Sequence, residues 1–152
     1  MSTLTPQQFE MLLPIACAWA EEQEHVILQL GVVLTESQFA DARRVGVALP
    51  ERVRLLRIPQ IPLPTHPALA AAANATGLIS PSTVGMTFRY GIFIRANCWG
   101  EGRLVVHELV HTMQYERLGG IEGFLRPYLL ECITPPGYPF GPLEQEAKRL
   151  SA

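Results

Sequence analysis

The residues with the clearest chemistry are two histidines and a glutamate that share one short motif. His107, Glu108 and His111 form the pattern H-E-x-x-H. Residues four apart on an α-helix lie about one turn apart and on nearly the same side. Two imidazoles at this spacing can bind one metal ion, with the carboxylate of Glu108 beside them. The motif therefore predicts a metal centre on a helix, with His107 and His111 as ligands.

Zinc is the metal that suits this set of side chains. It accepts imidazole nitrogen and carboxylate oxygen, and three protein ligands leave a fourth position for water. Water bound to zinc is far more acidic than free water, so Glu108 can act as the general base that takes its proton. Glu108 would then pass the proton to the departing amine. The motif predicts zinc-dependent hydrolysis of a peptide bond, with a peptide or protein as substrate.

The chain around the motif has the pattern of an amphipathic helix. At about 100° per residue, one broad arc of this helix is apolar and the motif residues occupy the remaining arc. The apolar residues are Val105, Val106, Leu109, Val110 and Met113. A helix of this kind can form the floor of a cleft that holds a metal.

The third metal ligand is open on the motif alone. The extended pattern H-E-x-x-H-x-x-G-x-x-H needs glycine and histidine where this chain has Gln114 and Arg117, so that type of site is excluded. No histidine follows His111, and a downstream carboxylate is expected instead. The choices are Glu116, Glu122, Glu131, Glu144 and Glu146.

Two motifs give the chain a resemblance to a known family. Residues 107–114 read H-E-L-V-H-T-M-Q and residues 142–147 read P-L-E-Q-E-A, and both are similar to gluzincin metallopeptidases, in particular small bacterial peptidase domains. The resemblance covers residues 45–150, including the segment 85–95. It implies a zincin-like fold, a zinc cofactor and Glu144 as the third ligand. Helical geometry alone leaves Glu146 open, since the two carboxylates lie about 200° apart on the helix.

The chain departs from the family pattern at Lys148. The family often has an aspartate there, whose carboxylate can orient a ligating histidine. With lysine at this position, Glu131 or a backbone carbonyl is a candidate for that role. The departure also motivates a second interpretation, a zinc-binding interaction or accessory domain that keeps the fold but has little or no turnover.

Capping signals and hydrophobic periodicity predict the elements that position these residues. The capping patterns at Thr5–Gln8 and Thr35–Gln38 begin two helices, and Pro14 should kink or split the first. The predicted helices span about 5–30, 35–46, 68–76, 100–118, 122–133 and a last segment from Pro142; the predicted strands span 52–58, 86–90 and 92–95. The fold class is therefore α+β, with N-terminal helices, a small β-sheet, the motif helix and a C-terminal helix that carries the third ligand.

Two features within this arrangement have alternative interpretations. The segment 91–95 is either an ordinary core strand or the edge strand along which an extended substrate lies. Tyr138, before the last helix, is either a packing residue or a hydrogen-bond donor to the tetrahedral intermediate.

Composition limits the remaining possibilities. The 152 residues predict a single domain over 1–152, and a net charge of -2 without a Lys/Arg run argues against a nucleic-acid partner. No apolar segment reaches the roughly 20 residues that cross a bilayer, so no membrane association is expected. The N-terminus lacks the pattern of an export signal, and the three cysteines have no paired spacing. A cytoplasmic location is the expectation.

Overall fold

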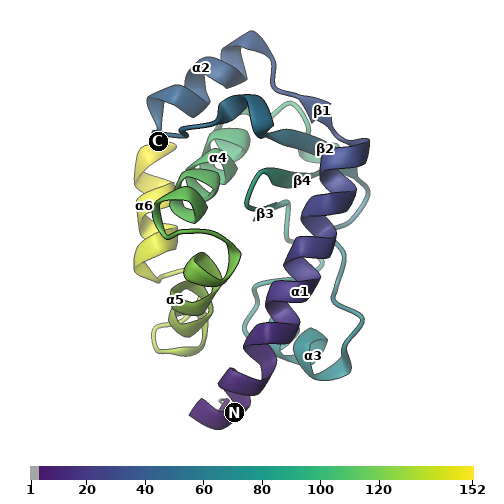
Figure 1. Ribbon diagram of the computed structural model, residues 1–152, viewed down its shortest axis with the longest axis vertical. Helices are drawn as coiled ribbons and strands as arrows, with labels where there is room; N and C mark the ends of the chain where they lie inside the picture. The colour runs from purple at the N-terminus through teal and green to yellow at the C-terminus, as the bar shows by residue number, and fades with distance from the viewer. Residues whose placement is uncertain (1–3) are drawn as a thin grey trace.

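The computed structural model describes residues 4–152 and has a mixed α+β architecture in that range (Figure 1). The six α-helices are α1 (Pro6–Leu30), α2 (Glu36–Arg44), α3 (Pro67–Ala75), α4 (Gly102–Arg117), α5 (Ile121–Ile133) and α6 (Pro142–Leu150). The four strands are β1 (Val32–Val33), β2 (Arg54–Ile58), β3 (Gly85–Phe88) and β4 (Gly91–Arg95), and two short 3-10 turns cover Pro50–Arg52 and Ala96–Cys98. The predicted α+β class is confirmed at this level.

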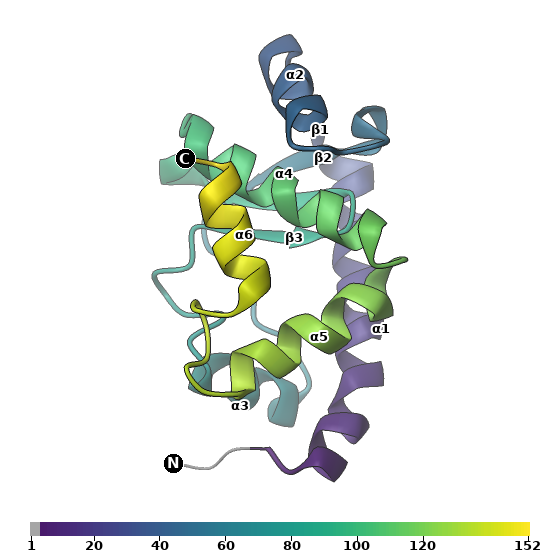
Figure 2. The same cartoon turned by 90° about the vertical axis from the view of Figure 1, so that its left-hand side faces the viewer.

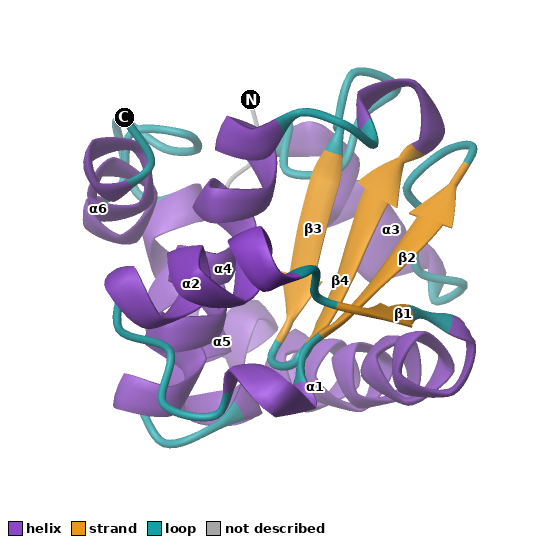
Figure 3. Cartoon of the chain, turned by 90° about the horizontal axis from the view of Figure 1, so that it is seen from above, coloured by secondary structure: helices purple, strands orange, loops and turns teal. Residues whose placement is uncertain are grey.

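The four strands form one mixed sheet in the order β1-β2-β4-β3 (Figure 3). β2 and β4 are parallel, whereas β1 pairs with β2 and β3 pairs with β4 in antiparallel fashion. Of the two interpretations of residues 91–95, the core strand is confirmed and the edge strand is wrong, because β4 has a neighbour on each side. The outer strand beside the motif helix α4 is β3 (Figure 3).

β4 is central because both of its faces are covered by helices. Phe93 packs in a core cluster with Ile27 of α1, while Ile92 and Ile94 pack in a second cluster with Leu109 of α4. Successive side chains of a strand point to opposite faces, so an apolar run of this kind suits a strand buried on both sides.

The turn between β3 and β4 lies at Arg89 and Tyr90, and the prediction that both belong to the strand 86–90 is wrong. Arg89 has a φ of 57°, an uncommon conformation for a side chain of this size. Its guanidinium donates to both carboxylate oxygens of Glu24 on α1, at 2.9 and 2.8 Å. Gly91 is instead the first residue of β4, where a Cβ would lie 3.0 Å from Ile27.

The N-terminal helix runs without interruption through Pro14. The proline removes one hydrogen bond to the carbonyl of Glu10, but both residues are exposed and water can hydrate that carbonyl. The capping boxes predicted at Thr5 and Thr35 are both present. Pro14 therefore does not split the helix.

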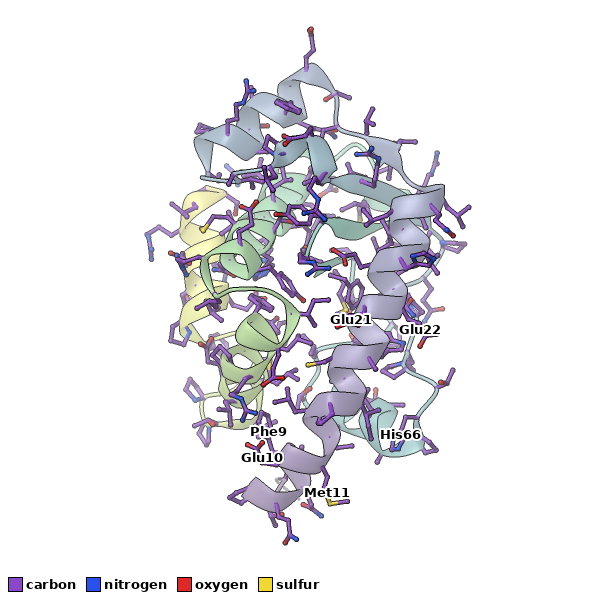
Figure 4. The ribbon with its side chains drawn as sticks, in the orientation of Figure 1. Phe9, Glu10, Met11, Glu21, Glu22 and His66 are labelled. Atoms are coloured by element: carbon purple, nitrogen blue, oxygen red, sulfur yellow. The ribbon has the colours of Figure 1, made fainter. Side chains whose placement is uncertain are left out.

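The helices enclose the sheet from several sides. α1 runs along most of the length of the molecule, and α5 and α6 lie together next to α4 (Figures 1 and 2). In Figure 4, Glu10 lies on the side of α1 that faces α5, where it accepts a 2.7 Å hydrogen bond from Arg126. Within residues 4–152, no helix is long and apolar enough to cross a bilayer, and the three cysteines are free thiols.

Candidate metal centre

The structure brings His107, His111 and Glu144 together from two helices. His107 and His111 lie one turn apart on α4, and Glu144 lies in the first turn of α6. Nε2 of His107 is 3.0 Å from Oε1 of Glu144, and Nε2 of His111 is 3.0 Å from Oε2. One ligand atom from each residue lies within 4.8 Å of the other two. Three side chains that the sequence proposed as ligands thus converge on one point.

α6 is fixed at the angle that directs Glu144 toward α4. Leu143 and Ala147 are buried on one side of the helix, which places Glu144 beside them at the histidines. The carboxylate of Glu131 accepts the backbone N–H of Leu143 at 2.9 Å, which anchors the helix start. Gly141 leaves room for this contact, since a Cβ there would lie 2.7 Å from the Glu131 side chain.

Glu146 has a different set of partners from Glu144. Its oxygens accept hydrogen bonds from Arg117 at 2.9 and 2.7 Å and from Gln114 at 2.7 Å. The hydrogen bonds from Arg117 are the main cause that lowers the pKa of Glu146 to about 2. Of the two carboxylates on α6, only Glu144 belongs to the group that could hold a metal.

The other candidate carboxylates also have structural partners. Glu116 accepts the backbone N–H groups of Ala48 and Leu49 and the hydroxyl of Tyr90. Glu122 pairs with Arg126 within α5, and Glu131 anchors α6 as described above. The suggestion that Glu131 orients a histidine is therefore wrong.

Gln114 contacts the ring of His111, the role for which the sequence had suggested Glu131 or a backbone carbonyl. Its Oε1 lies 2.7 Å from Nδ1 of His111, while its Nε2 donates to the carbonyl of Leu143 and to Glu146. Because the amide nitrogen donates in both of those bonds, Oε1 is the acceptor and Nδ1 carries the proton. This tautomer leaves Nε2 of His111 free to act as a ligand.

Tyr128 is a contact of Glu144 that sequence reasoning missed. The phenol, on α5, donates a 2.6 Å hydrogen bond to Oε2 of Glu144. Burial is the main cause that raises the pKa of Tyr128 well above its usual value, so the hydroxyl keeps its proton and remains a donor. The spacing of Phe124 and Tyr128, four residues apart on one helical face, is the sequence signal that could have indicated an inward-facing phenol.

Glu108 lies beside the histidines and contacts the edge strand of the sheet. The hydroxyl of Thr87 on β3 lies 2.8 Å from Oε1 of Glu108 and 3.1 Å from its backbone carbonyl. A Cβ at Gly85, on the same strand, would lie 3.2 Å from Oε2 of Glu108. The edge strand therefore fixes one oxygen of the carboxylate and leaves space for the other.

His111 on α4 and Glu144 on α6 each shift the pKa of the other. Burial alone lowers the pKa of His111, but the hydrogen bond to Glu144 and its negative charge outweigh that effect and raise the pKa to about 9. Burial raises the pKa of Glu144, but hydrogen bonds from His107 and His111 hold it well below its usual value. In the absence of a metal, an imidazolium and a carboxylate therefore neutralise each other.

A cavity of about 140 Å³ adjoins the three converging side chains. His107, Glu108, His111 and Glu144 all line it, and so does Tyr138 from the loop before α6. Burial is the main cause that raises the pKa of Tyr138, followed by the charges of Glu144 and Glu108, so its phenol stays protonated. The candidate metal centre is thus open to a space that a ligand can enter.

Comparison with known protein families, curated proteins and solved structures found no match to this chain. The functional conclusion therefore depends on the chemistry and geometry of the residues themselves.

Proposed function

We propose that this chain is a zinc metallopeptidase with a zincin-like fold, in which Glu108 is the general base. The observation that carries the proposal is the convergence of His107, His111 and Glu144 from two helices, with Glu108 directly beside them. Two imidazoles and one carboxylate are a known ligand set of catalytic zinc. The resemblance of residues 107–114 and 142–147 to gluzincins supports the same assignment.

The donor atoms are of the types that zinc accepts, imidazole nitrogen and carboxylate oxygen. Nε2 of His107 lies 3.0 Å from Oε1 of Glu144, and Nε2 of His111 lies 3.0 Å from Oε2. Gln114 is hydrogen-bonded to His111, and Tyr128 is hydrogen-bonded to Glu144. Hydrogen bonds of this kind commonly orient the side chains that bind a metal. His107, His111 and Glu144 would hold the ion.

Zinc bound at these residues would supply an acidified water and polarise the substrate carbonyl. The protein's part in the reaction is proton transfer and orientation. Glu108 takes a proton on the oxygen that Thr87 does not hold, Oε2, and returns it to the nitrogen of the departing amine. The protonated phenol of Tyr138 lines the same space and can donate to the oxygen that gains negative charge during the attack.

The edge strand β3 is a place along which the substrate could bind. β3 is the outer strand of the sheet, its residues 85–88 line the cavity beside the motif helix, and the carbonyl of Thr87 already accepts the hydroxyl of Tyr115. An extended peptide can add to such an edge through main-chain hydrogen bonds. β3 therefore takes the role that the sequence had suggested for residues 91–95.

The direct test is metal content followed by hydrolysis. The purified protein is loaded with zinc, dialysed and measured by elemental analysis, then incubated with a peptide library whose products are read by mass spectrometry. We expect about one zinc per chain and new peptide termini, which disappear when a chelator removes the metal. Protein without zinc overturns the whole proposal. Zinc without any cleavage favours the alternative of a zinc-binding accessory domain.

A further inference from the structure

The cavity beside the candidate metal centre extends well beyond the residues that carry chemistry. Its wall includes α1 residues from Phe9 to Ala20, which span about 16 Å along the helix at its usual rise. α3 and α4 lie well apart in Figures 1 and 2, and residues of both helices line the cavity. The cavity therefore extends from the candidate metal centre on α4 and α6 toward α3.

The part of the wall away from the metal centre is almost entirely apolar. The side chains there come from α1, α3 and α5, and they include Leu13, Ala16, Leu69, Ala73 and Leu125. The hydroxyl of Thr76 donates to the carbonyl of Ala73, and that of Tyr115 donates to the carbonyl of Thr87. The histidines and carboxylates that line the cavity lie on α4 and α6, and the phenol of Tyr128 donates to Glu144 at the same end, whereas Cys132 adds a thiol from α5.

The apolar lining of this part of the cavity favours a ligand with few polar groups. An extended peptide over about 16 Å would bring roughly five residues into the apolar part, since each residue spans about 3.3 Å. Their N–H and C=O groups would lose water and find no partners on helices whose own backbone groups are already paired. A hydrocarbon chain has no polar groups to leave unpaired, and it gains free energy when it leaves water.

We propose that the apolar part of the cavity binds the long hydrocarbon chain of an acylated peptide, with the polar end of that substrate at the metal centre. The assignment of the polar end rests on the function proposed above. The apolar wall and the centre are continuous, since one cavity is lined by both Ala16 and Glu108. The preferred substrates are therefore peptides that carry a fatty acyl group.

The test is a chain-length series measured as binding, so that it does not depend on turnover. One short peptide is prepared with N-acyl groups from acetyl to dodecanoyl, and its affinity for the zinc-loaded Glu108→Gln protein is measured by calorimetry. We expect affinity to rise about fourfold for each methylene that is buried and to level off when the cavity is full. Equal affinity across the series overturns the proposal.

Cavity-filling variants locate the binding site. Ala16→Phe and Ala73→Phe place a ring in the apolar part, so the plateau should move to shorter chains. Ala18→Phe and Ala71→Phe add the same ring to the exposed faces of the same two helices and should leave the series unchanged. Bound zinc and circular dichroism show that each variant is folded. If Ala16→Phe and Ala73→Phe are both folded and affinity still levels off at the same acyl-chain length as in the parent protein, the assignment to this cavity is overturned.

A second experiment distinguishes between an acylated peptide and a free fatty acid as the ligand, since both have the same hydrocarbon chain. Dodecanoate is titrated beside the dodecanoyl peptide, and we expect the peptide to bind at least as tightly. Tighter binding of the free acid overturns the substrate class. If the series holds but the wild-type protein cleaves none of the acylated peptides, the proposed function fails while the acyl-chain site stands.

Discussion

The hydroxyl of Thr87 lies 2.8 Å from Oε1 of Glu108, and this contact connects the edge strand of the sheet to the proposed general base. Thr87 also reaches the backbone carbonyl of Glu108, so β3 and α4 are joined at the motif itself. A carboxylate with one oxygen in a hydrogen bond has fewer orientations than a free one, so the direction of its second oxygen is better defined. In the proposed reaction the sheet would therefore help to position the general base, although it supplies none of the proposed ligands.

Replacing Thr87 with valine should slow hydrolysis without loss of metal. The side chain keeps its shape but no longer donates to Glu108, and a hydrogen bond to a charged group is worth about 1.5–3 kcal/mol. We expect kcat to fall about 10- to 100-fold for Thr87→Val, while zinc content stays the same. Glu108→Gln is the reference variant, with a loss of about 100- to 10,000-fold. An unchanged kcat for Thr87→Val would exclude a role in positioning.

Replacing the two carboxylates of α6 separately should distinguish the ligand from its neighbour. Glu144→Ala removes the group that faces both histidines, so zinc content should fall to background, as it should for His111→Ala. Glu146→Ala is the matched control on the same helix and should retain zinc, because Glu146 pairs with Arg117. Elemental analysis after dialysis measures the difference. Retained zinc in Glu144→Ala together with loss in Glu146→Ala would reverse the assignment.

The hydroxyl of Tyr128 should strengthen metal binding. Tyr128→Phe removes only the donor to Glu144, and losses of this kind typically weaken metal affinity about 10- to 100-fold. Tyr90→Phe removes a comparable hydroxyl, which is hydrogen-bonded to Glu116, and should leave affinity unchanged. Competition with a chromophoric chelator gives both affinities. Equal values would show that Tyr128 only packs against the site.

Zinc binding should release a proton, and affinity should fall as the pH falls. In the metal-free protein, Gln114 accepts from Nδ1 of His111 while Glu144 favours a proton on Nε2. The pKa of His111 is raised from 6.5 to about 9, so the proton on Nε2 must leave when a metal binds below that pH. Apparent affinity should decrease about tenfold for each pH unit below about 9. Calorimetry in buffers of different ionisation enthalpy counts the protons, and a count of zero would contradict the expectation.

Replacing Arg89 with alanine should destabilise the fold through Glu24. Glu24 is buried, and loss of Arg89 leaves its carboxylate without a cation and with only the backbone N–H of Tyr90, at a cost of about 3 kcal/mol. Arg126→Ala is the control, because its pair with Glu10 is exposed on both sides and should contribute little to stability. Urea denaturation measures both free energies of unfolding. A smaller effect for Arg89→Ala than for Arg126→Ala would contradict this reading of the turn.

Local signals in the sequence predicted most of the helices and the motif. The capping boxes at Thr5 and Thr35 are short-range patterns with a direct physical cause, and both are present. The spacing of His107 and His111 likewise depends only on helical geometry. Strand order could not be predicted in this way, because β2 and β4 pair across a long connection and apolar residues 91–95 suit either an edge or a centre.

The surroundings of the site were harder to predict than its proposed ligands. Thr87, Gln114 and Tyr128 come from three different elements, and their contacts exist only because the sheet, α4 and α5 pack together. Helical periodicity placed Glu144 and Glu146 on different sides of α6 but did not say which side faces α4. That choice depends on the burial of Leu143 and Ala147 in the assembled core.

The separation of His111 and Glu144 along the chain has a consequence for the dynamics of the C-terminus. A metal that joins them closes a loop containing all of α5, and such a crosslink restricts the open states of the segment. Removal of the metal releases this constraint, so the amide hydrogens of α6 should exchange with solvent faster than those of α4. The last helix would then be the first part of the fold to open, and a protease that cuts near Gly137 would report the metal content of the molecule.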